Sequence, residues 1–102
     1  MGMKRKVVER ETLASKVRSE VLASDFHPSN ILKIVNRYLK QFPDNVDLLT
    51  LKAEMLILLD RDAAAEKILN RIEFLDERHP LLFFSRATLL VRKKNRRRAA
   101  QE

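Results

Sequence analysis

A short segment that occurs twice, 34 residues apart, constrains the fold of this chain more than any other sequence feature. Residues 33–37 (KIVNR) align at this offset with residues 67–71 (KILNR), with four identical residues and one conservative apolar change. The same offset aligns four residues of the next segment with a second set: Leu48, Lys52, Ala53 and Leu56 with Leu82, Arg86, Ala87 and Leu90. Matches in two segments at one offset indicate an internal repeat, which is typical of stacked-repeat proteins.

Helical periodicity and turn residues divide the chain into five predicted helices. Pro28 stands where proline is tolerated at the first position of a helix, and Pro43 and Pro80 mark two further breaks. Asp44 or Asn45 can cap the segment that follows. The predicted helices cover about residues 8–23, 28–42, 46–59 and 63–76, and a fifth begins at about 81. Because every linker is short, we expect an all-α fold of antiparallel helical hairpins stacked on one another.

Composition and charge support one helical domain with basic ends. The chain has one glycine, whereas a sheet protein of 102 residues needs several turns. Nine of the 21 basic residues lie near the two ends, and 12 basic and 13 acidic residues lie between Val7 and Val91. We therefore expect a disordered basic segment at 1–7, a helical domain at 8–95 and a basic tail at 96–102. The absence of cysteine and of a long apolar run favours a cytoplasmic protein without a membrane span.

The 34-residue period and the residues at key positions resemble the tetratricopeptide repeat family. Leu49 and Phe83 stand at the family's tryptophan position, and Ala53 and Ala87 stand at its small-residue position. The remaining matches follow the same order: Leu56 and Leu90, Ile31 and Ala65, Val35 and Leu69, and Pro43. Lys52, Arg86 and Glu77 depart from the pattern. The resemblance covers about residues 8–98 as two and a half repeats; the alternative is a generic helical bundle with the same period.

The resemblance implies a non-enzymatic module that binds a protein or peptide in the groove formed by the first helix of each hairpin. The groove-facing positions carried over are Thr50, Glu54, Ile57, Leu58, Phe84, Thr88, Val91 and Arg92, with Arg18, Val21 and Leu22 from helix 8–23. These residues are mainly apolar, so the expected ligand is an amphipathic helix or an extended apolar segment. Small tetratricopeptide-like chaperones of bacterial secretion systems are similar in size and hold such ligands, which suggests a chaperone-like role.

Catalytic, metal and cofactor sites are not predicted. His27 and His79 each precede a proline in a linker, and the sequence has no pair of metal ligands spaced on one helical face as in H-E-x-x-H. Asp60 and Asp62 lie at a helix junction, where capping of helix 63–76 explains them. The sequence also has no glycine-rich phosphate loop and no nucleophile elbow. We therefore expect no cofactor and no enzymatic activity.

The basic C-terminal stretch supports an alternative function, that of a nucleic-acid-associated adaptor. Its basic residues are Arg92, Lys93, Lys94, Arg96, Arg97 and Arg98. Cations of this kind can neutralise phosphates and release counterions. They also complement the negative end of the last helix dipole, and no aromatic residue is interleaved to stack on bases.

The last predicted helix carries more apolar surface than one neighbour can cover. On a helical wheel, Phe83, Ala87 and Leu90 centre the face that we expect to pack on helix 63–76. Leu82 and Leu89 extend this face on one side, so that with Phe84 and Val91 the apolar arc spans roughly 220°. We therefore expect Leu82 and Leu89 to form an oligomer or partner face, with a homodimer as the simplest closure.

Overall fold

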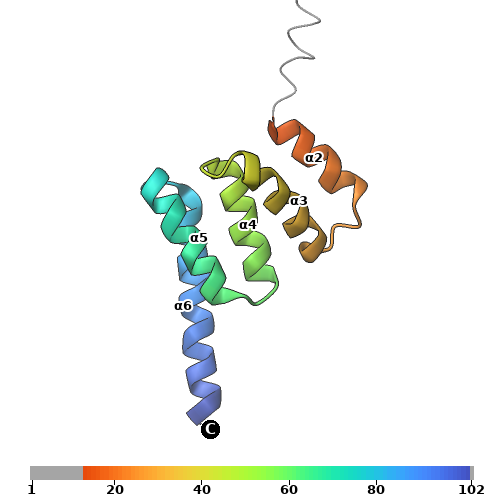
Figure 1. The fold of residues 1–102 in the computed structure, drawn as a ribbon. Helices are drawn as coiled ribbons and strands as arrows, with labels where there is room; N and C mark the ends of the chain where they lie inside the picture. Colours follow the sequence, from red (N-terminus) through yellow and green to blue (C-terminus); the bar gives the residue numbers. More distant parts are fainter. Residues whose placement is uncertain (1–12, 102) are drawn as a thin grey trace, which may run out of the picture.

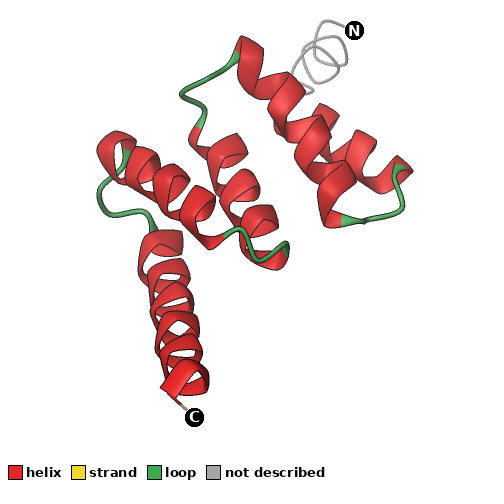
Figure 2. Ribbon diagram, turned by 60° about the horizontal axis from the view of Figure 1, so that its bottom comes forward, coloured by secondary structure: helices red, strands yellow, loops and turns green. Residues whose placement is uncertain are grey.

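The computed structural model describes residues 13–101, which form five α-helices and no strand (Figure 2). The helices are α2 (Leu13–Ala23), α3 (Pro28–Gln41), α4 (Val46–Leu58), α5 (Asp62–Leu75) and α6 (Pro80–Gln101). The predicted all-α fold of five helices is confirmed, and all four breaks between the helices fall within one residue of the predicted positions. Residues 1–7 and the first turn of helix 8–23 lie outside the described residues.

The helices follow one another as antiparallel neighbours in a stack of helical hairpins (Figure 1). α4 lies inside the stack, between α3 on one side and α5 on the other. α2 packs on α3 at one end of the stack, while α6 packs on α5 and also touches α4 at the other end. An interior helix therefore has two extensive neighbours, and the terminal helix α6 has one.

The starts of α3 and α4 follow from polar side chains that satisfy free backbone N–H groups. The His27 Nδ1 atom accepts a hydrogen bond from the Ser29 backbone N–H at 3.2 Å, and Pro28 opens the helix as predicted. The Asn45 Oδ1 atom accepts from the Leu48 backbone N–H at 3.0 Å. His79 has the equivalent role before α6, where its Nδ1 atom accepts from the Leu81 N–H at 3.1 Å. Both histidines therefore act as turn and cap residues.

The start of α5 differs from the prediction that Asp60 or Asp62 caps it. Arg61 occupies the N-cap position, and no side chain makes a capping hydrogen bond there. Asp60 instead takes a left-handed backbone conformation with φ of 58°, which aspartate tolerates better than most residues. Asp62 is the first residue of the helix, and its carboxylate binds arginines of α6. The capping prediction is wrong because these ion pairs occupy the Asp62 carboxylate.

The core is centred on the residues that the internal repeat places in equivalent positions. Val35 and Leu69, which are 34 residues apart, are both completely buried. Ala53 of α4 and Ala65 of α5 are also completely buried, and their small side chains leave room for close packing of these helices. Full burial of a leucine such as Leu69 contributes about 1.5–3 kcal/mol relative to leaving it exposed.

The last helix continues through the segment predicted as a separate tail. α6 has 22 residues, whereas the other four helices have 11 to 14. Its C-terminal half projects beyond the rest of the stack (Figures 1 and 2). Residues 96–101 remain helical because they are good helix formers and include neither glycine nor proline.

None of the described helices, α6 included, combines the length and the apolar character that crossing a bilayer requires.

Candidate protein-binding surfaces

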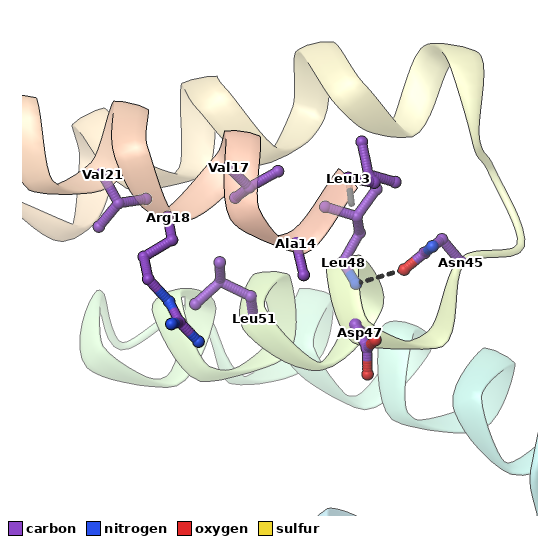
Figure 3. Close-up of a pocket in the computed structure, with 9 residues that line it drawn as sticks. All are labelled: Leu13, Ala14, Val17, Arg18, Val21, Asn45, Asp47, Leu48 and Leu51. Carbon is purple, nitrogen blue, oxygen red and sulfur yellow. Dashed lines mark hydrogen bonds between the residues drawn. The ribbon is translucent and has the colours of Figure 1, made fainter. Parts of the chain in front are cut away.

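A pocket of about 280 Å³ lies between α2 and α4 (Figure 3). Val17 and Leu48 are buried at its base, and the half-buried side chains of Leu13, Val21 and Leu51 form its walls. Its polar residues lie toward the two ends, Arg18 at one and Asn45 and Asp47 at the other. The pocket thus presents an apolar interior and a polar rim, a combination that suits an apolar side chain of a peptide.

The predicted groove residues of α4 all reach the surface, but the pocket uses their neighbours. Glu54 and Leu58 are exposed, and Thr50 and Ile57 are half-buried. The Thr50 hydroxyl donates to the Asp47 carbonyl at 2.8 Å and is therefore satisfied within its own helix. The predicted set omitted the pocket residues Asp47, Leu48 and Leu51. Of the positions predicted on α2, Arg18 and Val21 line the pocket, whereas Leu22 is exposed outside it.

A second apolar surface lies on α6, and we call it the α6 stripe. Its members are Phe83, Phe84, Ala87, Leu90 and Val91, all exposed. Phe83 is 84% exposed and Phe84 is 74% exposed. A shallow depression of about 380 Å³ runs along part of the stripe, bordered by Thr88 and Arg92. Phe84, Thr88 and Val91, three of the predicted groove residues, therefore lie together on this surface.

The predicted partner face at Leu82 and Leu89 is wrong. Both side chains are buried, at 4% and 5% exposure, and they pack inside the chain together with Ser85. The predicted core residues Phe83, Ala87 and Leu90 are instead exposed. α6 is therefore rotated by about one residue, or roughly 100°, from the predicted orientation.

In this orientation of α6, Arg86 makes polar contacts with α5. Its Nη1 atom donates to Glu73 Oε2 at 2.6 Å, and its Nη2 atom donates to Asn70 Oδ1 at 3.0 Å. The Arg86 guanidinium holds the pKa of the Glu73 carboxyl below its usual value of 4.5. Ser85, a small residue between Leu82 and Leu89, leaves room for close contact with the neighbouring helices. These interactions favour the observed face over the more apolar face of the α6 stripe.

The six basic residues proposed for nucleic-acid contact separate into two groups. Arg92 Nη1 donates to Asp62 Oδ1 at 2.7 Å and to the Ile57 carbonyl at 2.9 Å. Arg96 Nη2 donates to Asp62 Oδ2 at 3.0 Å. These two arginines are therefore held by α4 and α5. The other four are exposed on the projecting part of α6: Lys93, Lys94, Arg97 and Arg98.

The Asp62 contacts could not be found in the sequence. Asp62 lies 30 residues from Arg92 and 34 from Arg96, and no local spacing rule connects residues so far apart. The Asp62 side chain is only 14% exposed, so its ion pairs are better shielded from water than those elsewhere on the surface. This junction connects the C-terminal end of α4 and the N-terminal end of α5 to the middle of α6, where the projecting segment starts.

Other polar clusters in the described residues have structural explanations. Glu20 of α2 pairs with Arg37 of α3, and the Tyr38 hydroxyl and the Arg37 guanidinium lower the pKa of Glu20. Asp44, in the linker before α4, pairs with Arg71 of α5. Residues 13–101 contain no group of three or more histidine, cysteine or acidic side chains that could hold a metal ion.

Comparisons of the chain with family models, with curated proteins and with solved structures found no match. The resemblance to tetratricopeptide repeats therefore depends on the 34-residue repeat and the residues quoted for it.

Proposed function

We propose that this chain is a non-enzymatic protein-interaction module that binds an amphipathic helix or an extended apolar segment on the surface formed by α2 and α4. The α2–α4 pocket is the observation that carries the proposal. Its interior is lined by Leu13, Val21 and Leu51, and its rim is polar. Removing apolar surface from water favours binding by about 25 cal/mol per Å². A peptide side chain in this pocket would gain that energy without unfolding any helix.

The surface beside the pocket extends the proposed binding site along α4. Leu58 is 62% exposed at the C-terminal end of α4, on the helical face that Leu51 and Glu54 share. A ligand longer than one side chain can therefore contact the pocket and Leu58 together. The chaperone-like role remains part of this proposal, because a surface of this kind shields apolar segments of another protein.

The proposal is tested with peptides selected from a displayed random library against the immobilised full chain. Affinity for a selected peptide is measured by calorimetry for the wild type and for Leu51→Asn and Leu58→Glu. We expect each variant to bind about tenfold more weakly or worse, because each introduces a polar group that the apolar ligand cannot satisfy. Phe74→Glu is the matched control, since Phe74 is 79% exposed on α5 and lines neither surface. Helicity measured by circular dichroism should be the same in all of them.

Unchanged affinity in both α4 variants would contradict a site at the pocket. Loss of binding in Phe74→Glu as well would show that the peptides recognise apolar surface without selecting a site.

The second candidate function, nucleic-acid association, is favoured by the four exposed cations on the projecting part of α6. Salt dependence separates it from the first. Binding to a short duplex should weaken steeply as salt rises, with a slope set by the phosphates neutralised. Lys93, Lys94, Arg97 and Arg98 are the residues to replace, because replacing Arg96 also breaks its pair with Asp62. Tight duplex binding that persists at high salt would favour this second function over a protein ligand.

A further inference from the structure

We propose that the α6 stripe is the docking site for an amphipathic helix of a partner protein, which lies antiparallel to α6 and carries acidic residues toward its N-terminal end. This site is separate from the α2–α4 pocket and goes beyond the proposed function.

The burial of α4 and α6 is alike on one face and differs most on another. Residues 48 and 55 of α4 correspond by the repeat to Leu82 and Leu89 of α6, and all four side chains are buried. A second face of α4 is also buried, and consists of Leu49 (4% exposed), Ala53 (0%) and Leu56 (4%). Its counterparts on α6 are Phe83 (84%), Ala87 (exposed) and Leu90 (55%). One face of the repeat is therefore covered in α4 and open in α6.

The neighbours of the two helices identify what covers that face. α4 packs between α3 and α5, and α6 packs on α5 in the way that α4 packs on α3. The face that α4 and α6 bury in common therefore faces the preceding helix, and α5 covers the second face of α4. No helix among the described residues takes the corresponding place on α6. The position open on α6 is thus the one that a helix occupies on α4.

The residues of this face suit a helix better than a small molecule. Phe83, Ala87 and Leu90 follow one another at spacings of four and three residues, so they share one side of α6. The small residue lies between two large ones, as Ala53 lies between Leu49 and Leu56. The small Ala53 side chain leaves room for α5 to approach closely, and Ala65, Leu69 and Ile72 of α5 are completely buried. An amphipathic helix with a small residue followed by large apolar residues would fit α6 in the same way.

The charge of the projecting part of α6 defines the rest of the partner. Lys94, Arg97 and Arg98 continue the side of the helix that begins with Phe83 and Ala87, and they border a depression together with Val91. A helix placed as α5 is placed on α4 starts beside the C-terminal part of α6. Its N-terminal residues would therefore lie beside these three cations. Acidic residues there would pair with them and would also complement the positive end of the partner helix dipole.

The same charges argue against a second copy of this chain as the occupant. Between Pro80 and Gln101 the sequence has seven basic residues and no acidic one. Arg86, Arg92 and Arg96 are already paired with Glu73 and Asp62. Two α6 helices packed stripe to stripe would bring together the remaining four cations of each, with no carboxylate on either helix to pair with them. Like charges at such a contact disfavour it. An acidic partner helix both covers the apolar residues and neutralises the basic ones.

Two helix-stabilised synthetic peptides with the sequence of residues 62–75 serve as probes, one preceded by a run of glutamates and the other by a run of lysines. Binding to the full chain is followed by fluorescence anisotropy at moderate salt. We expect the glutamate peptide to bind at least about tenfold more tightly than the lysine peptide. Leu90→Glu should abolish binding of the glutamate peptide, because it places a carboxylate in the middle of the apolar face. Phe74→Glu is the control and should leave binding unchanged, since Phe74 lies on α5 and is exposed.

A charge-reversal variant tests the proposed orientation. In Lys94→Glu/Arg98→Glu, the preference should reverse in favour of the lysine peptide, since both replaced side chains are exposed and the fold should be retained. Equal binding of the two peptides, or full binding by Leu90→Glu, would overturn the proposal. Binding lost in Leu58→Glu but not in Leu90→Glu would instead assign the peptide to the α2–α4 side. A dimer of the chain alone that Leu90→Glu dissociates, seen by sedimentation equilibrium, would replace the partner helix by a second copy.

Discussion

α4 and α6 begin at equivalent positions of the 34-residue repeat, and they differ in the helices that pack against them. α4 is apolar on two faces and buries both, one toward α3 and the other toward α5. α6 is apolar on the same two faces but buries only that of Leu82 and Leu89. The same pattern of apolar residues therefore forms core in α4 and an exposed surface in α6. The difference lies in the tertiary position, because the residue types are similar.

The largest effect should come from matched truncations of the repeat-equivalent pair Leu56 and Leu90. Leu56 is 4% exposed, and Leu56→Ala should lower the free energy of unfolding by about 2–5 kcal/mol through lost burial and the cavity left behind. Leu90 is 55% exposed, and Leu90→Ala should change the free energy of unfolding by no more than about 0.5 kcal/mol. Urea unfolding followed by circular dichroism measures both. Comparable losses in the two variants would mean that the α6 stripe is covered in solution.

A smaller effect is expected at the junction that distinguishes α6 from α4. Asp62→Ala removes the carboxylate that holds Arg92 and Arg96, and we expect a loss of about 1–2 kcal/mol in the free energy of unfolding. The matched control is Asp60→Asn, because Asp60 is 75% exposed, lies 3.4 Å from Arg92, and asparagine tolerates its positive φ. This control should lower the free energy of unfolding by much less than Asp62→Ala does. If the two variants are equally destabilised, Asp62 does not anchor α6.

The smallest effect should appear at the repeat-equivalent pair Arg86 and Lys52 as a dependence on pH. Because the folded pKa of Glu73 lies below 4.5, its pair with Arg86 stabilises the fold above that value. This contribution is lost as the pH falls through the folded pKa of Glu73. Wild type and Arg86→Ala should therefore differ more in stability at about pH 7 than at a low pH, below the folded pKa of Glu73; the hydrogen bond from Arg86 to Asn70 is present at both. A difference of equal size at the two pH values would assign the role of Arg86 to that hydrogen bond and to packing.

Lys52→Ala is the control for this experiment, since no ion pair of Lys52 is found within residues 13–101. Its effect should not change between the two pH values. High salt should reduce the Arg86 effect as well, because the pair is exposed to solvent and is screened.

Local features of the sequence were sufficient to predict the helices and most of their starts. Pro28 and Asn45 open α3 and α4 as predicted, because a fixed φ angle and a side-chain cap act within a few residues. The predicted site was recovered less well. The α4 positions reach the surface as predicted, but the pocket beside them also requires α2, whose packing no local pattern specifies. At α5 the capping prediction failed because Asp62 binds Arg92 and Arg96 from a distant part of the chain.

Sequence patterns alone predict that residues 13–101 are helical, where their helices break, and that two segments repeat at 34 residues. These properties depend on the propensities of neighbouring residues and on periodic patterns, which act over one or two turns. Which face of α6 is buried depends on the tertiary structure. Its apolar arc is wide enough to allow two orientations, and Ser85, Arg86 and the Asp62 junction select the one that buries Leu82 and Leu89. The orientation of α6 depends on contacts between helices that are distant in sequence, and it leaves Phe83 and Leu90 exposed.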